Sequence, residues 1–239
     1  MKQGLSRKKL GILGGMGPLA TAHFFRRIVE NTQASRDQKH IDLVLFNEAS
    51  MPDRTQAILT QNYEPFFLLL KGKAQSLAGL GVDHIALPCV TSHFFYNELQ
   101  ANVNVPIINM LQESIIYALE KYPEAKKIGI LSTDGTLQSK MYHRYAERFG
   151  VSIIEPSTES QKKLVSIIYD EVKGGKKGNN KALARIISEL KHNGAEMVIL
   201  ACTELSCLNY NLPTGCVDAL EVLAKKSIEV SGGTYKGDL

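Results

Sequence analysis

Two of the four cysteines stand where a proton-transferring group would be expected. Cys89 and Cys202 each end a short apolar run and precede hydroxyl-bearing residues, with Thr91 and Ser92 after the first and Thr203 after the second. A thiol with an ordinary pKa of about 8.5 exchanges its proton nearer to working pH than a carboxyl does. Backbone N–H groups at a following helix start would stabilise the thiolate. A buried core cysteine suits the same positions equally well, so position alone leaves both interpretations open.

Both cysteines belong to an internal repeat. Residues 8–21 read KKLGILGGMGPLAT and residues 126–139 read KKIGILSTDGTLQS, with seven of fourteen positions identical. Further along, GVDHIALPCVT at 81–91 matches GAEMVILACTE at 194–204 at a constant offset of 113 residues. Two matches in the same order indicate a duplicated unit, in which a strand, a glycine-rich turn and a helix lead to a strand that ends in cysteine.

The repeat predicts that the two cysteines share one cleft. Ligands of open parallel sheets bind beyond the carboxyl ends of the strands, where both cysteines and both glycine-rich turns fall. If the halves face each other about a pseudo-two-fold axis, Cys89 and Cys202 approach a ligand from opposite sides. One group can then remove a proton from a carbon while the other delivers a proton to the opposite face. Inversion of a stereocentre needs this arrangement.

Alternating apolar runs and amphipathic stretches define the elements that position these residues. We expect strands at 10–13, 41–46, 84–87, 128–131, 153–154 and 197–201, and helices at 21–32, 64–78, 111–122, 139–149, 159–173, 182–192 and 219–230. This alternation predicts an α/β fold with two pseudo-symmetric domains, each a parallel sheet flanked by helices, and an active site in the cleft between them. The predicted domains are 8–112 and 113–218, with the helix at 219–230 packing back on the first.

Composition and charge exclude other classes of protein. The 239 residues carry 28 Lys and Arg against 24 Asp and Glu, a field too weak to indicate a nucleic-acid partner or a membrane surface. No apolar run approaches the roughly 20 residues of a membrane span. We therefore expect a cytoplasmic protein with free cysteines, in which Cys207 and Cys216 are core residues. The sequence contains no C-x-x-C pair, and its histidines do not have the spacing of metal ligands, so we expect no metal site.

Four motifs, in order along nearly the whole chain, resemble those of a known family. They are GGMGP at 14–18, MPDRT at 51–55, PCVTSH at 88–93 and ACTEL at 201–205. The chain is similar in them to the aspartate/glutamate racemases that need no pyridoxal phosphate, and particularly to the aspartate racemase branch. The resemblance implies catalytic cysteines at Cys89 and Cys202, no cofactor, a small acidic amino-acid substrate and a homodimer.

A dicarboxylic substrate needs cations for its second carboxylate. Arg54, in the Pro-Asp-Arg-Thr turn, would offer a bidentate fork. By the resemblance, Lys162 matches a family position that faces the substrate. Either side chain is otherwise an ordinary solvated charge.

Other residues around the two turns complete the expected site. We expect Met16 and Gly17 to line the cleft, with the glycine permitting close backbone approach. Thr133 and Thr136 occupy the equivalent turn of the second half and are candidate donors to the substrate. The remaining expected substrate contacts are Thr91, Ser92 and Thr203.

Two carboxylates are candidates to orient or tune the thiols. Asp53 and Glu204 would do so by hydrogen bonding, although a turn-capping Asp and a solvated Glu at a helix start are equally consistent with the sequence. We interpret His93 as structural.

One position departs from the family pattern. The family's first cysteine is usually followed by Asn-Thr-Ala, whereas Val90, Thr91 and Ser92 follow Cys89 here. The asparagine amide helps to hold the α-carboxylate or amino group of the substrate, and valine can do neither. Backbone N–H groups and Thr91 are left for that task.

Three other functions remain open. Gly15-x-Gly17-x-x-Ala20 resembles a dinucleotide fingerprint, but the next acidic residue after a strand, Glu48, lies 33 residues past Gly15 instead of about 20. A second alternative is another reaction of the same superfamily, such as decarboxylation, cis–trans isomerisation or hydantoin racemisation. A third is a catalytically silent binder of acidic amino acids, for which Val90 is the argument. Retention of both cysteines favours racemisation.

Overall fold

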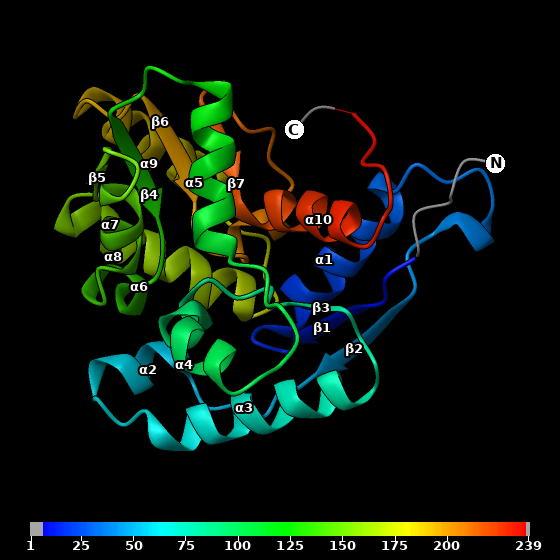
Figure 1. The fold of residues 1–239 in the computed structure, drawn as a ribbon. Coiled ribbons are helices and arrows are strands. Elements are labelled where there is room, and N and C mark those ends of the chain that lie inside the picture. The colour runs from blue at the N-terminus through cyan, green and yellow to red at the C-terminus, as the bar shows by residue number, and fades with distance from the viewer. Residues whose placement is uncertain (1–6, 238–239) are drawn as a thin grey trace.

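The computed structural model describes residues 7–237 and contains two parallel sheets, one in each half of the chain (Figure 1). The first sheet has the order β2-β1-β3, from β1 (Leu10–Gly14), β2 (Leu43–Asn47) and β3 (His84–Ala86). The second has the order β5-β4-β6-β7, from β4 (Lys127–Leu131), β5 (Ser152–Ile154), β6 (Met197–Leu200) and β7 (Cys216–Asp218). The predicted α/β fold class is confirmed.

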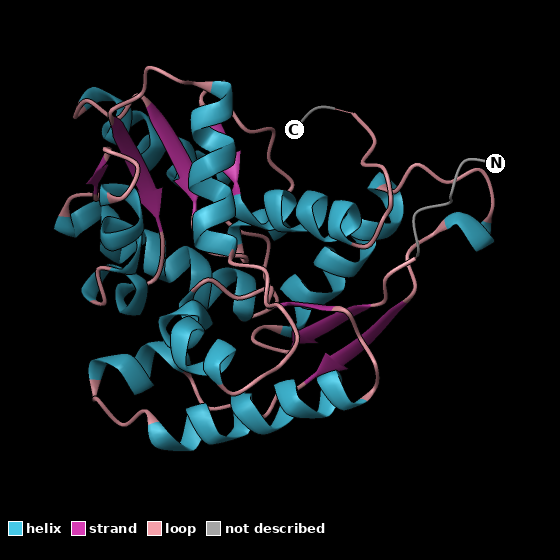
Figure 2. Ribbon diagram, viewed as in Figure 1, coloured by secondary structure: helices cyan, strands magenta, loops and turns pink. Residues whose placement is uncertain are grey.

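Helices surround both sheets (Figure 2). In the first half they are α1 (Pro18–Asn31), α2 (Arg54–Leu59), α3 (Glu64–Gly79) and α4 (Tyr96–Ala101). Then follow α5 (Met110–Lys121), α6 (Asp134–Gln138), α7 (Met141–Glu147), α8 (Thr158–Ser166), a π-helical segment (Ile167–Lys173), α9 (Asn180–His192) and α10 (Ala219–Val230). Among residues 7–237, no helix combines the length and apolar character that crossing a bilayer requires.

The two sheets repeat one topology. In each, the first strand of the half lies between the second and third strands, so β1, β2 and β3 correspond to β4, β5 and β6. The fourth strand differs. β7 pairs with β6 over three residues, whereas the first half has only an isolated bridge between Ile85 and Ile107. The strand pairing therefore agrees with the duplication inferred from the repeat.

A shared core joins the halves. One apolar cluster contains residues of both central strands, such as Ile12 and Ile130, together with residues of α1, α5 and α10. α10 packs against both α1 and α5 (Figure 1). The division into domains 8–112 and 113–218, with the helix at 219–230 assigned to the first, stays a prediction.

Several elements differ from the expectation. β7 and the short helices α2, α4 and α6 were not predicted, because three to six residues are too few to show a period. The helix expected at 139–149 begins only at Met141, since Lys140 adopts a left-handed conformation with φ of 52° and separates α6 from α7. The helix expected at 159–173 changes from α to π geometry at Ile167.

Candidate active site

A small cavity between the two halves contains both candidate cysteines. It is lined by Met16, Arg54, Thr55, Cys89, Val90, Thr91, Thr133, Tyr169, Lys173, Cys202, Thr203 and Glu204. These residues follow the carboxyl ends of strands in both sheets or belong to helices that cover those ends. The cavity volume is about 10 Å³, roughly the space of one water molecule. Since a ligand pocket usually has about 300 Å³ or more, side chains must move before an amino acid can bind.

The turn after β3 holds Cys89, which is 5% exposed. The backbone N–H of Met110 donates to Nε2 of His93 at 3.2 Å, so the neutral ring carries its proton on Nδ1 and donates to the Cys89 carbonyl at 2.9 Å. Burial lowers the pKa of His93 and keeps the ring neutral. His93 therefore fixes the backbone of Cys89, which agrees with the structural interpretation.

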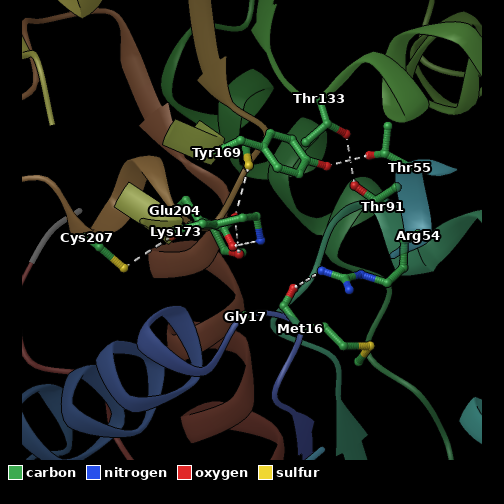
Figure 3. A network of polar contacts seen from close by, with 12 residues as sticks. Met16, Gly17, Arg54, Thr55, Thr91, Thr133, Tyr169, Lys173, Glu204 and Cys207 are labelled. Atoms are coloured by element: carbon green, nitrogen blue, oxygen red, sulfur yellow. Dashed lines mark hydrogen bonds and ion pairs between the residues drawn. The ribbon is translucent and has the colours of Figure 1, made fainter. Parts of the chain in front are cut away.

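Arg54 provides the cation next to Cys89. Its guanidinium donates to the carbonyl of Met16 at 2.9 Å (Figure 3). It also donates to the carbonyl of Pro52 at 3.3 Å. Burial lowers the pKa of Arg54, but the neighbouring Cys89 and Asp53 side chains outweigh burial and raise it. Nε is buried and has no hydrogen-bond partner within the described residues. Arg54 thus places a positive charge beside the Cys89 thiol, and its Nε–H is free to donate a hydrogen bond to a ligand.

Glu204 provides the anion next to Cys202. The Cys202 thiol donates to Oε2 of Glu204 at 3.1 Å, and Oε1 of the same carboxylate pairs with the ammonium of Lys173 (Figure 3). Burial, and then the charge of Glu204, raise the pKa of Cys202 well above its ordinary value. Cys202 is therefore a neutral thiol in this arrangement. Two carboxylates were expected to orient a thiol, and one of them, Glu204, contacts the Cys202 thiol in the structure.

Asp53 has a different place. Its carboxylate accepts from the backbone N–H of Gln56 at 2.8 Å and caps the start of α2. The side chain does not line the cysteine cavity, and its charge acts on Arg54. Asp53 fixes the turn that carries Arg54.

Three lining residues, Thr55, Tyr169 and Lys173, were not among the candidates from the sequence. Tyr169 and Lys173 lie four residues apart in the π-helical segment, and the Lys173 ammonium is 5.6 Å from the centre of the Tyr169 ring. Burial lowers the pKa of Lys173, but the charge of Glu204 outweighs burial and raises it. Tyr169 donates to the hydroxyl of Thr55 at 2.9 Å, and burial raises the pKa of Tyr169 to about 12.

The structure does not bring Lys162 into the cavity. Leu164, Ile167 and Ile168 are fully buried, and Lys162 lies on the exposed face of α8. Lys173, eleven residues later, is the second cation at the thiols.

Threonine hydroxyls join the halves beside the cavity. Thr91 lies 3.1 Å from both Thr133 and Thr136, which are 3.2 Å apart, all measured between Oγ1 atoms. Thr91 and Thr133 line the cavity, whereas Thr136 lies behind them. Ser92 also lies outside, fully buried, where it donates to the sulfur of Met16 at 3.4 Å.

The paired glycines of the repeat make reciprocal contacts across the halves. A Cβ at Gly17 would lie 3.1 Å from Oε1 of Glu204, and a Cβ at Gly135 would lie 2.9 Å from Cα of Thr55. The turn at Gly135 therefore approaches the backbone of the opposite half more closely than a Cβ would allow, whereas a Cβ at Gly17 would require the Glu204 side chain to shift by a few tenths of an ångström.

Two similar parallel-sheet halves that each present a cysteine to one cavity define the class of the protein as a two-domain α/β enzyme of the racemase type. Residues 13–226 match the sequence model of the family described as Asp/Glu/Hydantoin racemase, and the chain belongs to this family. It is an amino-acid racemase, an isomerase.

Individual relatives agree with this assignment. The chain is 27% identical over 226 residues to the broad specificity amino-acid racemase RacX of Bacillus subtilis (strain 168), covering 92% of this chain and 96% of RacX. Among solved structures, the aspartate racemase of Picrophilus torridus matches with a TM-score of 0.79 and 26% identity, covering 96% of both chains. An aspartate racemase homologue from Pyrococcus horikoshii OT3 matches with a TM-score of 0.74 and 25% identity, covering 94% of this chain and 99% of the other.

Proposed function

We propose that the protein interconverts the L and D forms of aspartate or glutamate by two-base proton transfer between Cys89 and Cys202, without pyridoxal phosphate. The observation that carries this proposal is the pairing of charges and thiols in one cavity: Arg54 beside Cys89, and Glu204 with Lys173 beside Cys202. Similarity to a solved aspartate racemase supports an acidic substrate.

The reaction begins with a thiolate on one side of the substrate and a thiol on the other. The Cys89 thiolate, stabilised by Arg54, takes the α-proton, and the electron pair of the C–H bond stays on Cα and spreads into the α-carboxylate. The Cys202 thiol then delivers its proton to the opposite face. The product has inverted configuration, and Cys89 ends as the thiol and Cys202 as the thiolate. The reverse reaction exchanges the two roles.

The substrate carboxylates are assigned to the cations and hydroxyls that line the cavity. The unpaired Nε of Arg54 offers a charge-assisted hydrogen bond to one carboxylate. Lys173 offers a second when it leaves Glu204, and that movement also enlarges the cavity. Thr91 and Thr133 present hydroxyls from opposite halves to the α-carboxylate. They replace part of what Val90 cannot provide.

An assay of chirality tests the proposal. The purified protein, without added pyridoxal phosphate, is incubated with each enantiomer of aspartate and glutamate in D₂O. Optical inversion and Cα–H loss are followed together. Inversion accompanied by deuterium incorporation is expected. Tight binding without exchange would replace the racemase by a silent binder of acidic amino acids, the alternative that Val90 in the cavity wall favours.

The homodimer and the cytoplasmic location are also proposals. Four cysteines that are all free fit a reducing compartment. Sedimentation velocity of the purified protein measures its oligomeric state, and a monomer at micromolar concentration would contradict the dimer.

A further inference from the structure

A second, larger cavity adjoins the one that contains the cysteines. Its volume is about 520 Å³, and its apolar wall comes from Pro18, Leu19, Ala49, Met51 and Val172. It collects residues from the turns after β1 and β2 and from the end of the π-helical segment. We call it the outer cavity.

The two cavities share one wall. Arg54, Lys173 and Glu204 line both of them, so these side chains stand between the outer cavity and the space between the thiols. Gly17 stands in the same wall on the outer side, where a Cβ would lie 3.1 Å from Glu204 Oε1 and 3.6 Å from Lys173 Nζ. The absence of a side chain at Gly17 leaves space beside this ion pair that a Cβ would fill.

We propose that the outer cavity binds the side chain of a longer, unbranched apolar amino acid, such as norleucine or methionine, while its α-carbon lies between Cys89 and Cys202. This proposal rests on the racemase function and extends its substrates beyond the acidic pair. The apolar wall selects such side chains, because burying each methylene improves binding by about fourfold. Leu19, which is 55% exposed, is the apolar surface that the substrate covers.

The ion pair in the shared wall favours a neutral side chain as well. An acidic substrate that binds Lys173 must compete with the Glu204 carboxylate, which already pairs with that ammonium. A neutral substrate leaves the pair intact and passes beside it over Gly17. Val90, which is 3% exposed and lines the cavity that contains the cysteines, adds a further apolar contact near the thiols.

A homologous series of substrates tests the proposal. Exchange of Cα–H in D₂O is measured for L-2-aminobutyrate, L-norvaline and L-norleucine, with L-aspartate in parallel. We expect kcat/KM to rise about fourfold with each added methylene. Turnover of aspartate with a flat or falling series would overturn the outer-cavity proposal and leave the acidic racemase intact. Turnover of none of the four would overturn both.

Two filling variants locate the effect. Ala49→Trp and Leu19→Trp place a large ring at exposed positions of the outer cavity. Each is expected to lower the ratio of norleucine to aspartate kcat/KM at least tenfold. Ser50→Trp is the matched control, because Ser50 is exposed beside Ala49 and does not line the cavity. An unchanged ratio in both filling variants would overturn the proposal, and two different positions guard against a folding defect in one.

Discussion

The two cysteine sites are related by the repeat but differ in charge. Cys89 lies beside the guanidinium of Arg54, whereas Cys202 donates to the carboxylate of Glu204. The sequence repeat alone makes the two thiols equivalent. The structure shows that the two matched positions of the repeat have differently charged neighbours. A cation beside one thiol, and beside the other an ion pair whose carboxylate accepts the thiol proton, suit the thiolate–thiol pair that a two-base reaction needs at its start.

Removal of either thiol, Cys89 or Cys202, should reduce the racemisation rate more than any other change. Cys89→Ala and Cys202→Ala are each expected to reduce racemisation of aspartate by at least about 10²–10⁴-fold, the contribution of one general acid or base. Polarimetry on each purified variant measures the loss. Cys207→Ala is the matched control, since Cys207 lies outside the cysteine cavity. A control as damaged as the two variants would show that folding, and not chemistry, had been changed.

Arg54 is the next test of the asymmetry. Arg54→Ala removes a charge-assisted hydrogen bond, which is worth about 1.5–3 kcal/mol, so we expect kcat/KM for aspartate to fall about 10–100-fold. Neutral substrates should lose less, because only an acidic side chain needs the second cation. Steady-state kinetics on aspartate and norleucine provide the comparison. Equal losses on both would assign Arg54 to the Cys89 thiolate alone.

Glu204→Gln should make the two sites more alike. The Glu204 charge raises the pKa of Cys202, so its removal lowers that pKa, although burial still holds it up. The Cys202 thiolate then forms at lower pH, and activity in the direction that needs Cys202 as a thiol should decline at lower pH than in the native enzyme. We expect kcat in that direction to fall about tenfold at neutral pH, less than the roughly 10²–10⁴-fold that removal of a whole general acid or base would cost. Glu155→Gln, in an ion pair with Lys140 away from the cavity, is the control and should keep the native pH profile.

Val90→Asn should have the smallest effect. An amide in the cavity wall would hold a polar group of aspartate, and one net hydrogen bond contributes about 0.5–1.5 kcal/mol. We therefore expect aspartate kcat/KM to rise about two- to tenfold. The norleucine rate should fall, because an apolar contact is lost. A fall on both substrates would indicate that valine fits a different ligand.

The sequence predicted those parts of the site that depend on strand ends. Short apolar runs reveal the strands that precede Cys89, Cys202 and Met16, and Arg54 belongs to the MPDRT motif. All four residues line the cavity. Glu204 beside Cys202 was a candidate, but the full charge difference between the two thiols was not predictable, because it also depends on where Arg54 and Lys173, distant in the sequence, fold over them.

Lys162 was the second cation expected from the sequence, whereas Lys173 occupies that place in the structure. Eleven residues make three turns of a regular α-helix, so Lys162 and Lys173 would share one face of a continuous helix. The change to π geometry at Ile167 alters that phase, and sequence periodicity does not reveal such a change. Only Lys173 reaches the thiols.

Exchange at Cα, followed separately for each enantiomer, tests the two-thiol account most directly. L- and D-aspartate are incubated in D₂O with Cys89→Ala and with Cys202→Ala, and Cα–H loss and chirality are read in parallel. The account predicts that neither variant racemises and that any remaining exchange is confined to one enantiomer in one variant and to the other enantiomer in the other. Racemisation near the native rate by either variant would contradict it and require a one-base or non-cysteine mechanism.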